Sequence, residues 1–329
     1  MILRQLIRFC LPVAILSCAL FGTTEAGEKA AFRWVDSPDD GTADLMFGDA
    51  KVLRYMYGFD TSSPQRAHET YKVYHHVFGP GSGRVITKGP GGKYTHHRGL
   101  YVGFNKTKAD GNSFDFWHCN KGEHLRHIKF LTQKGGDNGG TMSALIHWND
   151  KDGKPVISET RTVTVTKVAT DAVPGFAWQI DWMTTLKSER GDIVLDGDRQ
   201  HAGFQFRADN AVAESNGATY LRPEGFPQQD AAFQVGKGDK HIDLGWFAMT
   251  YELDKQRYNI EYFDNPSLPK PSRFSERPYG RFGTFFRTTL KPDEPLTMKY
   301  RVRVSAGKTP KAADIQKRYE SFLGELKSK

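Results

Sequence analysis

A long series of short segments, in which apolar and polar residues alternate, restricts this chain to a fold built from β-strands. In the clearest segment, residues 156–168, a threonine occupies every second position from Thr160 to Thr166. Because successive side chains of a strand point to opposite faces, this alternation predicts a half-buried strand. No helical period separates such segments, so we expect an all-β protein with antiparallel sheets. The other segments lie at 51–58, 71–78, 99–104, 125–131, 141–148, 176–182, 202–207, 245–253, 256–263, 281–290 and 297–304.

The convincing helical pattern of the sequence lies near its C-terminus, over residues 310–327. Thr309 can cap this helix, Pro310 suits its first turn, and apolar side chains from Ile315 to Leu326 form one face. We expect the helix to pack on the outside of a large antiparallel β-sandwich.

Two stretches rich in Gly and Pro, residues 79–93 and 264–280, interrupt the series of strands. Their length is typical of loops that carry function rather than of simple connections. The first stretch lacks the spacing of a phosphate-binding loop, because Lys93 is followed by Tyr94 instead of Ser or Thr. Nucleotide binding is therefore not expected at this loop.

The first 26 residues have the pattern of a secretory signal peptide. Two arginines precede an apolar run over residues 9–21, and the cleavage region follows at residues 24–26. The run is too short to span a membrane, and no later segment reaches the length of a spanning helix. A lipoprotein signal at Cys18 fits less well, since Cys18 lies inside the apolar run. We expect an exported protein, periplasmic or secreted, with no transmembrane segment after signal cleavage.

The remainder of the chain, residues 27–329, is expected to form a single domain. It would keep Cys119 as its one cysteine, so stability would come from an apolar core and not from disulfides. Roughly 300 residues are enough to bury such a core. The formal net charge is +8, but the basic residues are scattered and form no stripe interleaved with aromatic residues. Nucleic acid is therefore not an expected partner.

Histidines are concentrated in one part of the chain. Nine of the eleven lie within residues 68–147, and four of these form the adjacent pairs 75–76 and 96–97. Histidine titrates near neutral pH and is the commonest metal ligand, so the concentration points to a functional site. Two neighbours such as His96 and His97 can share one site only where a strand starts or bulges. Single histidines of β-proteins otherwise serve mostly in the core or at the surface.

Motifs spread over most of the chain carry a family resemblance. They are Thr95-His96-His97-Arg98-Gly99-Leu100-Tyr101, Asp115-Phe116-Trp117, Gly122 with 124–127, Ser158-Glu159-Thr160-Arg161, 201–207, Asp264-Asn265-Pro266 and 278–283. In this order they resemble a family of exported bacterial proteins that is often labelled methane oxygenase PmoA-like. The resemblance implies a large β-sandwich of the galactose-mutarotase type (a supersandwich) and a link to glycan digestion. The oxygenase label itself fits poorly, because true particulate methane oxygenase subunits cross the membrane several times.

In a sandwich of this type, a concave sheet face meets the loops at one edge. A sugar reaction on this face needs a proton acceptor, a proton donor and a cation. The catalytic candidates are therefore His96, His97, His118, Glu159 and His201. The substrate-binding candidates are Arg98, Trp117, Arg161, Arg207, Asp264, Asn265 and Arg281. The alternative is structural: tryptophans are frequent in cores, and Glu159 with Arg161 could form an ordinary surface ion pair.

Three functions agree with this pattern. The first is an exported carbohydrate-active enzyme of the epimerase, lyase or hydrolase type, whose partner is a carbohydrate or glycan substrate. The second is a non-catalytic glycan-binding module, which would need the aromatic surface but no reactive histidines. The third is a histidine-rich metalloprotein with the oxygenase-type chemistry of the family label. No cofactor is predicted, although the histidines could hold a divalent metal.

Overall fold

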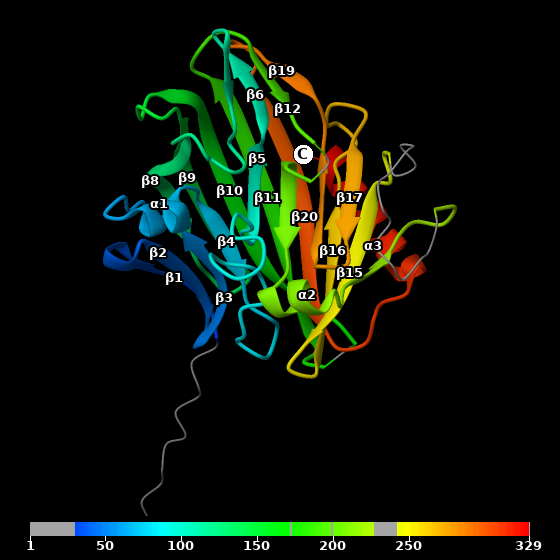
Figure 1. Cartoon of the computed structure of the whole chain (residues 1–329). Helices are drawn as coiled ribbons and strands as arrows, with labels where there is room; N and C mark the ends of the chain where they lie inside the picture. The colour runs from blue at the N-terminus through cyan, green and yellow to red at the C-terminus, as the bar shows by residue number, and fades with distance from the viewer. Residues whose placement is uncertain (1–29, 172, 199, 227–241, 329) are drawn as a thin grey trace, which may run out of the picture.

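Antiparallel strands make up most of the computed structural model, which describes residues 30–171, 173–198, 200–226 and 242–328 (Figure 1). The expected signal peptide at residues 1–26 lies outside these residues. Within them, every named strand pairs with its neighbours in antiparallel fashion, as the alternating segments predict. No helix of the described part is long and apolar enough to cross a membrane.

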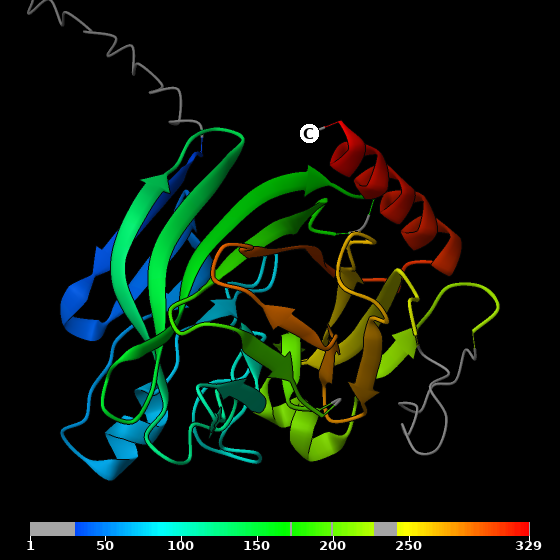
Figure 2. The same cartoon turned by 90° about the horizontal axis from the view of Figure 1, so that it is seen from above.

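Two eight-stranded sheets face each other (Figure 2), and a four-stranded sheet lies at one end of them. The first sheet has the order β1 (Phe32–Ser37), β2 (Thr42–Phe47), β3 (Ala50–Met56), β4 (Tyr74–Val77), β5 (Leu100–Phe104), β13 (Ala202–Arg207), β18 (Arg281–Phe285) and β17 (Arg273–Arg277). The second has the order β14 (Thr219–Leu221), β15 (Trp246–Leu253), β16 (Gln256–Phe263), β20 (Leu296–Ala306), β11 (Phe176–Ser188), β10 (Pro155–Ala169), β9 (Gly139–Asn149) and β8 (His124–Lys134). The small sheet joins β19 (Thr288–Leu290), β12 (Ile193–Asp196), β6 (Lys106–Ala109) and β7 (Asn112–Phe114).

The predicted strands are present with shifted ends, and the all-β sandwich is confirmed. One predicted segment, 281–290, divides into β18 and β19, because the chain leaves the first sheet after Phe285 and enters the small one. β17 lies inside 264–280, which the Gly and Pro content predicts to be a loop. The sequence pattern also does not predict β1, β2, β6, β7, β12, β14 or the short helices α1 (Pro64–Thr70) and α2 (Asn210–Ser215).

Aromatic side chains from both large sheets fill the space between them. The ring of Trp182 on β11 lies 4.7 Å from that of Phe204 on β13, and Phe204 stacks on Tyr300 of β20 at 4.7 Å. These three side chains are at most 1% exposed. Burial of such large apolar groups is the main favourable contribution to folding, and here it joins the two sheets directly.

The C-terminal helix α3 (Ala312–Lys327) packs on the outer side of the second sheet, as predicted (Figure 2). Tyr319 and Phe322 lie against Phe263 of β16, and Trp246 of β15 completes the contact. The helix begins two residues later than predicted. Its N-cap position is held by Lys311, whose backbone is extended, and no side chain caps it.

His75 on β4 is one of the clustered histidines that the fold places in the core. Its side chain is fully buried, its ring stacks on Tyr55 at 4.7 Å, and neither ring nitrogen has a hydrogen-bond partner in the described chain. Burial holds the pKa of His75 well below its ordinary value. The residue therefore stays neutral in the folded protein and has a structural role.

We expect His75→Phe to make the stability of the protein less sensitive to acid. The unfolded chain takes up a proton at His75 below about pH 6.5, and the folded chain excludes it. The stability present above that pH is thus lost as the pH falls, by about 2 kcal/mol at pH 5. Urea unfolding at pH 7 and pH 5 measures this difference. Equal acid sensitivity of variant and wild-type protein would contradict the prediction.

Candidate metal centre

Three histidines from separate loops meet beside the paired strands β5 and β13. His96 lies in a turn before β5, His118 lies between β7 and β8, and His201 directly precedes β13. β5 and β13 are hydrogen-bonded neighbours, with Ala202 opposite Phe104. Because the two strands are antiparallel, the turn before β5 and the loop before β13 start from opposite ends of the pair, and His96 and His201 approach each other across it.

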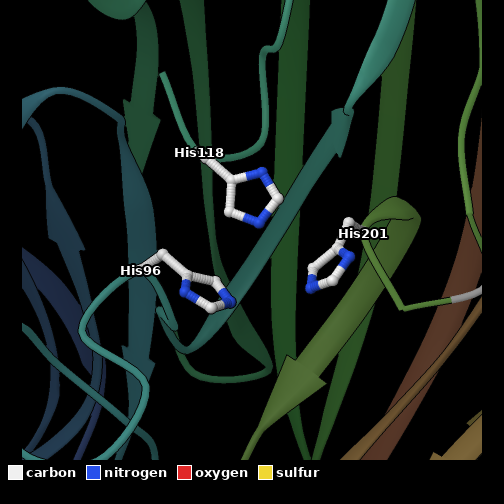
Figure 3. Close-up of side chains that lie close together, drawn as sticks. All are labelled: His96, His118 and His201. Atoms are coloured by element: carbon white, nitrogen blue, oxygen red, sulfur yellow. The ribbon is translucent and has the colours of Figure 1, made fainter. Parts of the chain in front are cut away.

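The three rings each turn one nitrogen toward a common space (Figure 3). The candidate ligand atoms of His96, His118 and His201 all lie within 4.8 Å of one another. Three nitrogens bound to one zinc ion at 2.0–2.1 Å would lie about 3.4 Å apart, so small side-chain movements would close the triad around a metal. The Nε2 atom of His96 is buried and has no hydrogen-bond partner among the described residues, which suits a ligand atom.

Two members of this histidine triad are held by carboxylates three residues before them. The Nδ1 atom of His118 lies 2.8 Å from an oxygen of Asp115, and that of His201 lies 2.9 Å from an oxygen of Asp198. Each aspartate also accepts hydrogen bonds from backbone N–H groups of its own loop. A carboxylate on one ring nitrogen fixes the tautomer and directs the lone pair of the other nitrogen outward, as in many metal sites.

The electrostatic surroundings keep His96 and His201 neutral and therefore able to bind a metal. Burial, with the nearby charge of Lys72, lowers the pKa of His96 to about 2. Burial lowers the pKa of His201, and the bond to Asp198 opposes this only in part. Burial raises the pKa of Asp198, but its bonds from His201 and the backbone lower it by more. Metal ligands must be deprotonated, and these shifts supply that state for His96 and His201 at neutral pH.

Three buried basic side chains lie around the triad, and the two arginines among them carry the positive charge, because burial holds the pKa of Lys72 well below its ordinary value. Lys72 and Arg207 both approach the ring of Trp117, at 5.4 and 5.3 Å, and Arg98 follows the paired histidines in sequence. Their hydrogen bonds go to neutral acceptors: Lys72 donates to the carbonyl of Trp117, Arg98 to backbone carbonyls, and Arg207 to the side chain of Gln205. None of the three pairs with a carboxylate within the described ranges. The region therefore carries a positive potential that favours anions.

Several predicted site residues do come together here. His96, His118 and His201 form the triad, and the ring of His97 lies 4.7 Å from that of His96. The pair can share a site because it lies in the turn before β5, where the strand has not started. His97 itself is 4% exposed, and burial holds its pKa well below the ordinary value. Three more predicted residues are fully buried and belong to the surroundings of the triad: Arg98, Trp117 and Arg207.

The other predicted residues lie elsewhere in the core. Glu159 and Arg161 are fully buried and bonded to each other at 2.7 Å, so the alternative of an ordinary surface ion pair is wrong. Asp264 contacts Thr284 at 3.3 Å, and the side chain of Asn265 accepts hydrogen bonds within its own loop. Arg281 is buried directly opposite Arg207 in the pairing of β18 with β13. A catalytic role for Glu159 and a substrate-binding role for the other four residues stay predictions.

The sequence reasoning missed the partners of the triad. Neither the residue type nor the spacing of Asp198 and Lys72 predicts a place in the site, although both act on the histidines. A signal was present: Asp-x-x-His occurs at 115–118 and again at 198–201. Two such motifs in separate loops could have identified His118 and His201 as a pair.

A cavity of about 580 Å³ opens beside the triad. His201 and Asp198 form part of its wall, Phe285 adds one aromatic ring, and the guanidinium groups of Arg273, Arg277 and Arg287 add positive charge. The side chains of His118 and His201 are 21% and 24% exposed. A molecule in the cavity could therefore reach the triad.

Comparison with solved structures gives distant similarities. The galactosidase domain of the α-galactosidase-sucrose kinase AgaSK has 10% identity and a TM-score of 0.41, over 83% of this chain and 41% of that one. A putative kojibiose phosphorylase from human microbiome has 10% identity and a TM-score of 0.33, over 92% and 36%. The α-N-acetylgalactosaminidase NagBb from Bifidobacterium bifidum, in complex with GalNAc, has 11% identity and a TM-score of 0.31, over 91% and 38%. The chain thus spans about two fifths of their length, and scores this low say nothing of its function.

Comparison of the sequence gives one family. The model of a family of unknown function (DUF6807) matches residues 42–320. No curated protein matches the chain. The family match does not bear on the resemblance to PmoA-like proteins, which stays a prediction.

Proposed function

The chain belongs to the family of unknown function DUF6807, and from the site of this member we propose that it is a metal-dependent enzyme that hydrolyses a carbohydrate substrate. The observation that carries the proposal is the convergence of His96, His118 and His201, two of them held by aspartates. Catalytic metal sites often have three protein ligands and keep a further position open for water or substrate.

The triad supports water activation better than direct acid–base catalysis by its histidines. A divalent metal, when bound, would lower the pKa of a coordinated water to about 7 and polarise a substrate oxygen. In this scheme His96, His118 and His201 act as ligands, and Asp115 and Asp198 orient two of them. The imidazoles then need no proton of their own, in keeping with the low pKa of His96.

The cavity beside His201 supports a sugar-sized polar substrate. Its volume of about 580 Å³ lies within the range of ligand sites, roughly 300–1,000 Å³. Charged groups of Arg273, Arg277 and Asp198 could bind the hydroxyl groups of a sugar.

Metal removal tests this proposal. The purified protein is expected to hold about one equivalent of a divalent metal per chain, measured by plasma mass spectrometry. Treatment with a strong chelator should abolish reducing-sugar release from a panel of glycans, and added zinc or manganese should restore it. A protein that binds none of the divalent transition metals would contradict the metal centre. Iron or copper with oxygen consumption, in place of hydrolysis, would overturn the hydrolytic function in favour of oxygenase chemistry.

A further inference from the structure

We propose that the cavity beside His201 binds the carboxylate of an acidic sugar. The substrate would then be a uronic acid or a glycan that contains one. This inference rests on the proposed function, because it names the substrate class of the same site. Three arginines on one wall of the cavity, close to the triad, carry the inference.

The fold directs these arginines to one place. Arg273 and Arg277 are the two ends of β17 and lie four residues apart, so their side chains point to the same face of the strand. Both are half-buried, whereas the three residues between them are buried. Arg287 follows β18, the hydrogen-bonded neighbour of β17, and its side chain is 68% exposed. The three guanidinium groups therefore reach the same cavity from adjacent strands.

The carboxylates of the cavity leave an excess of positive charge. Asp198 is engaged by His201 at 2.9 Å and by Asn105 at 2.8 Å. Asp196 approaches Arg287 at 3.6 Å. Arg273 lies over the ring of Phe285 at 5.8 Å and forms no ion pair with any described residue. A bound anion would supply the partner that Arg273 lacks there.

The chemistry of these groups favours a carboxylate on a sugar. A guanidinium group donates two parallel hydrogen bonds to a carboxylate, which gives both direction and strength. Arg207 is buried next to the cavity wall, where it donates a hydrogen bond to the carbonyl of Gln200. Its charge adds to the positive potential of the cavity. The guanidinium group of Arg273 lies over the ring of Phe285, which is itself buried, and this contact holds Arg273 at the cavity. With the carboxylate held there, the rest of the substrate would lie toward His201.

Calorimetric titration of the zinc-loaded protein with D-glucuronate and with D-glucose tests the inference. We expect glucuronate to bind at least about tenfold more tightly than glucose, as for a charge-assisted hydrogen bond. Arg273→Gln should remove most of this preference and leave the zinc content unchanged. Arg287→Gln, at an exposed position that does not endanger folding, should reduce it. The matched control is Arg257→Gln, because Arg257 pairs with Glu252 on the β15–β16 hairpin and lines no part of the cavity.

Equal affinities for glucuronate and glucose in the zinc-loaded wild-type protein would overturn the inference. Tighter binding of glucose 6-sulfate than of glucuronate would also overturn it, because the site would then recognise a sulfate. Failure of the protein to bind zinc or any other divalent transition metal would instead contradict the proposed function. The same titration of the metal-free protein would in that case still test the carboxylate site by itself.

Discussion

The His201→Ala variant is expected to lose its metal and its activity while the sandwich stays folded. The side chain of His201 is 24% exposed in the loop before β13, so its removal leaves neither a buried charge nor a large void in the core. Loss of one of three protein ligands should lower the metal affinity by more than the roughly 10- to 100-fold that loss of an outer partner costs. Competition with a coloured chelator measures the affinity, and circular dichroism checks the fold.

Two further variants are compared with His201→Ala, one with a smaller expected loss of metal affinity and one with no expected loss. Asp198→Asn keeps the ligand but removes the charge that orients it, and should lower the metal affinity by about 10- to 100-fold. His147→Ala removes a half-buried histidine of β9 outside the triad and should bind metal as the wild-type protein does. Unchanged metal affinity of His201→Ala would exclude the triad as the metal site.

The Glu159→Gln variant is expected to be less stable by about 3–5 kcal/mol. Glu159 is fully buried and accepts hydrogen bonds from Arg161, from Trp148 at 2.8 Å and from Thr184 at 3.1 Å. A neutral glutamine would leave the guanidinium group of Arg161 buried without its charge partner, and an uncompensated buried charge is strongly destabilising. Urea unfolding followed by fluorescence measures the loss.

An exposed ion pair provides the control for this experiment. Glu252→Gln breaks the pair of Glu252 with Arg257, whose side chains are 55% and 45% exposed, and should change the stability by less than about 1 kcal/mol. If Glu159→Gln instead abolished activity and left the stability near that of the wild-type protein, Glu159 would be catalytic, as the sequence predicts.

The β10 strand shows how far alternation predicts the fold. The threonines of 160–166 are half-buried, and Glu159, Arg161, Val163 and Val165 on the other face are fully buried. The sequence therefore predicts that Glu159 and Arg161 share a face. It does not predict which of the two faces of the strand points into the core, because the alternation has a period of two in both cases. Strands of three to six residues, such as β12 and β14, are too short to show a period.

The sequence predicts that the histidines of the triad share one pocket with Glu159 and Arg161, but it does not predict which strands bring them together. His96, His118 and His201 are all catalytic candidates from their residue type and motifs. Their meeting depends on the pairing of β5 with β13, which joins segments about a hundred residues apart. Alternation within one strand contains no information about such a distant partner. The repeated Asp-x-x-His motif is local and would have been the better guide.

A metal on the triad would also act as a cross-link between three distant points of the chain. Closing two long loops reduces the freedom of the unfolded chain, and this effect grows slowly with loop length. Cys119 is the one cysteine among the described residues, and it is buried and unpaired. No disulfide therefore cross-links this part of the chain. Ligand binding to the folded state alone shifts the folding equilibrium by mass action. The resistance of this protein to heat and proteases should therefore depend on the metal supply of its surroundings.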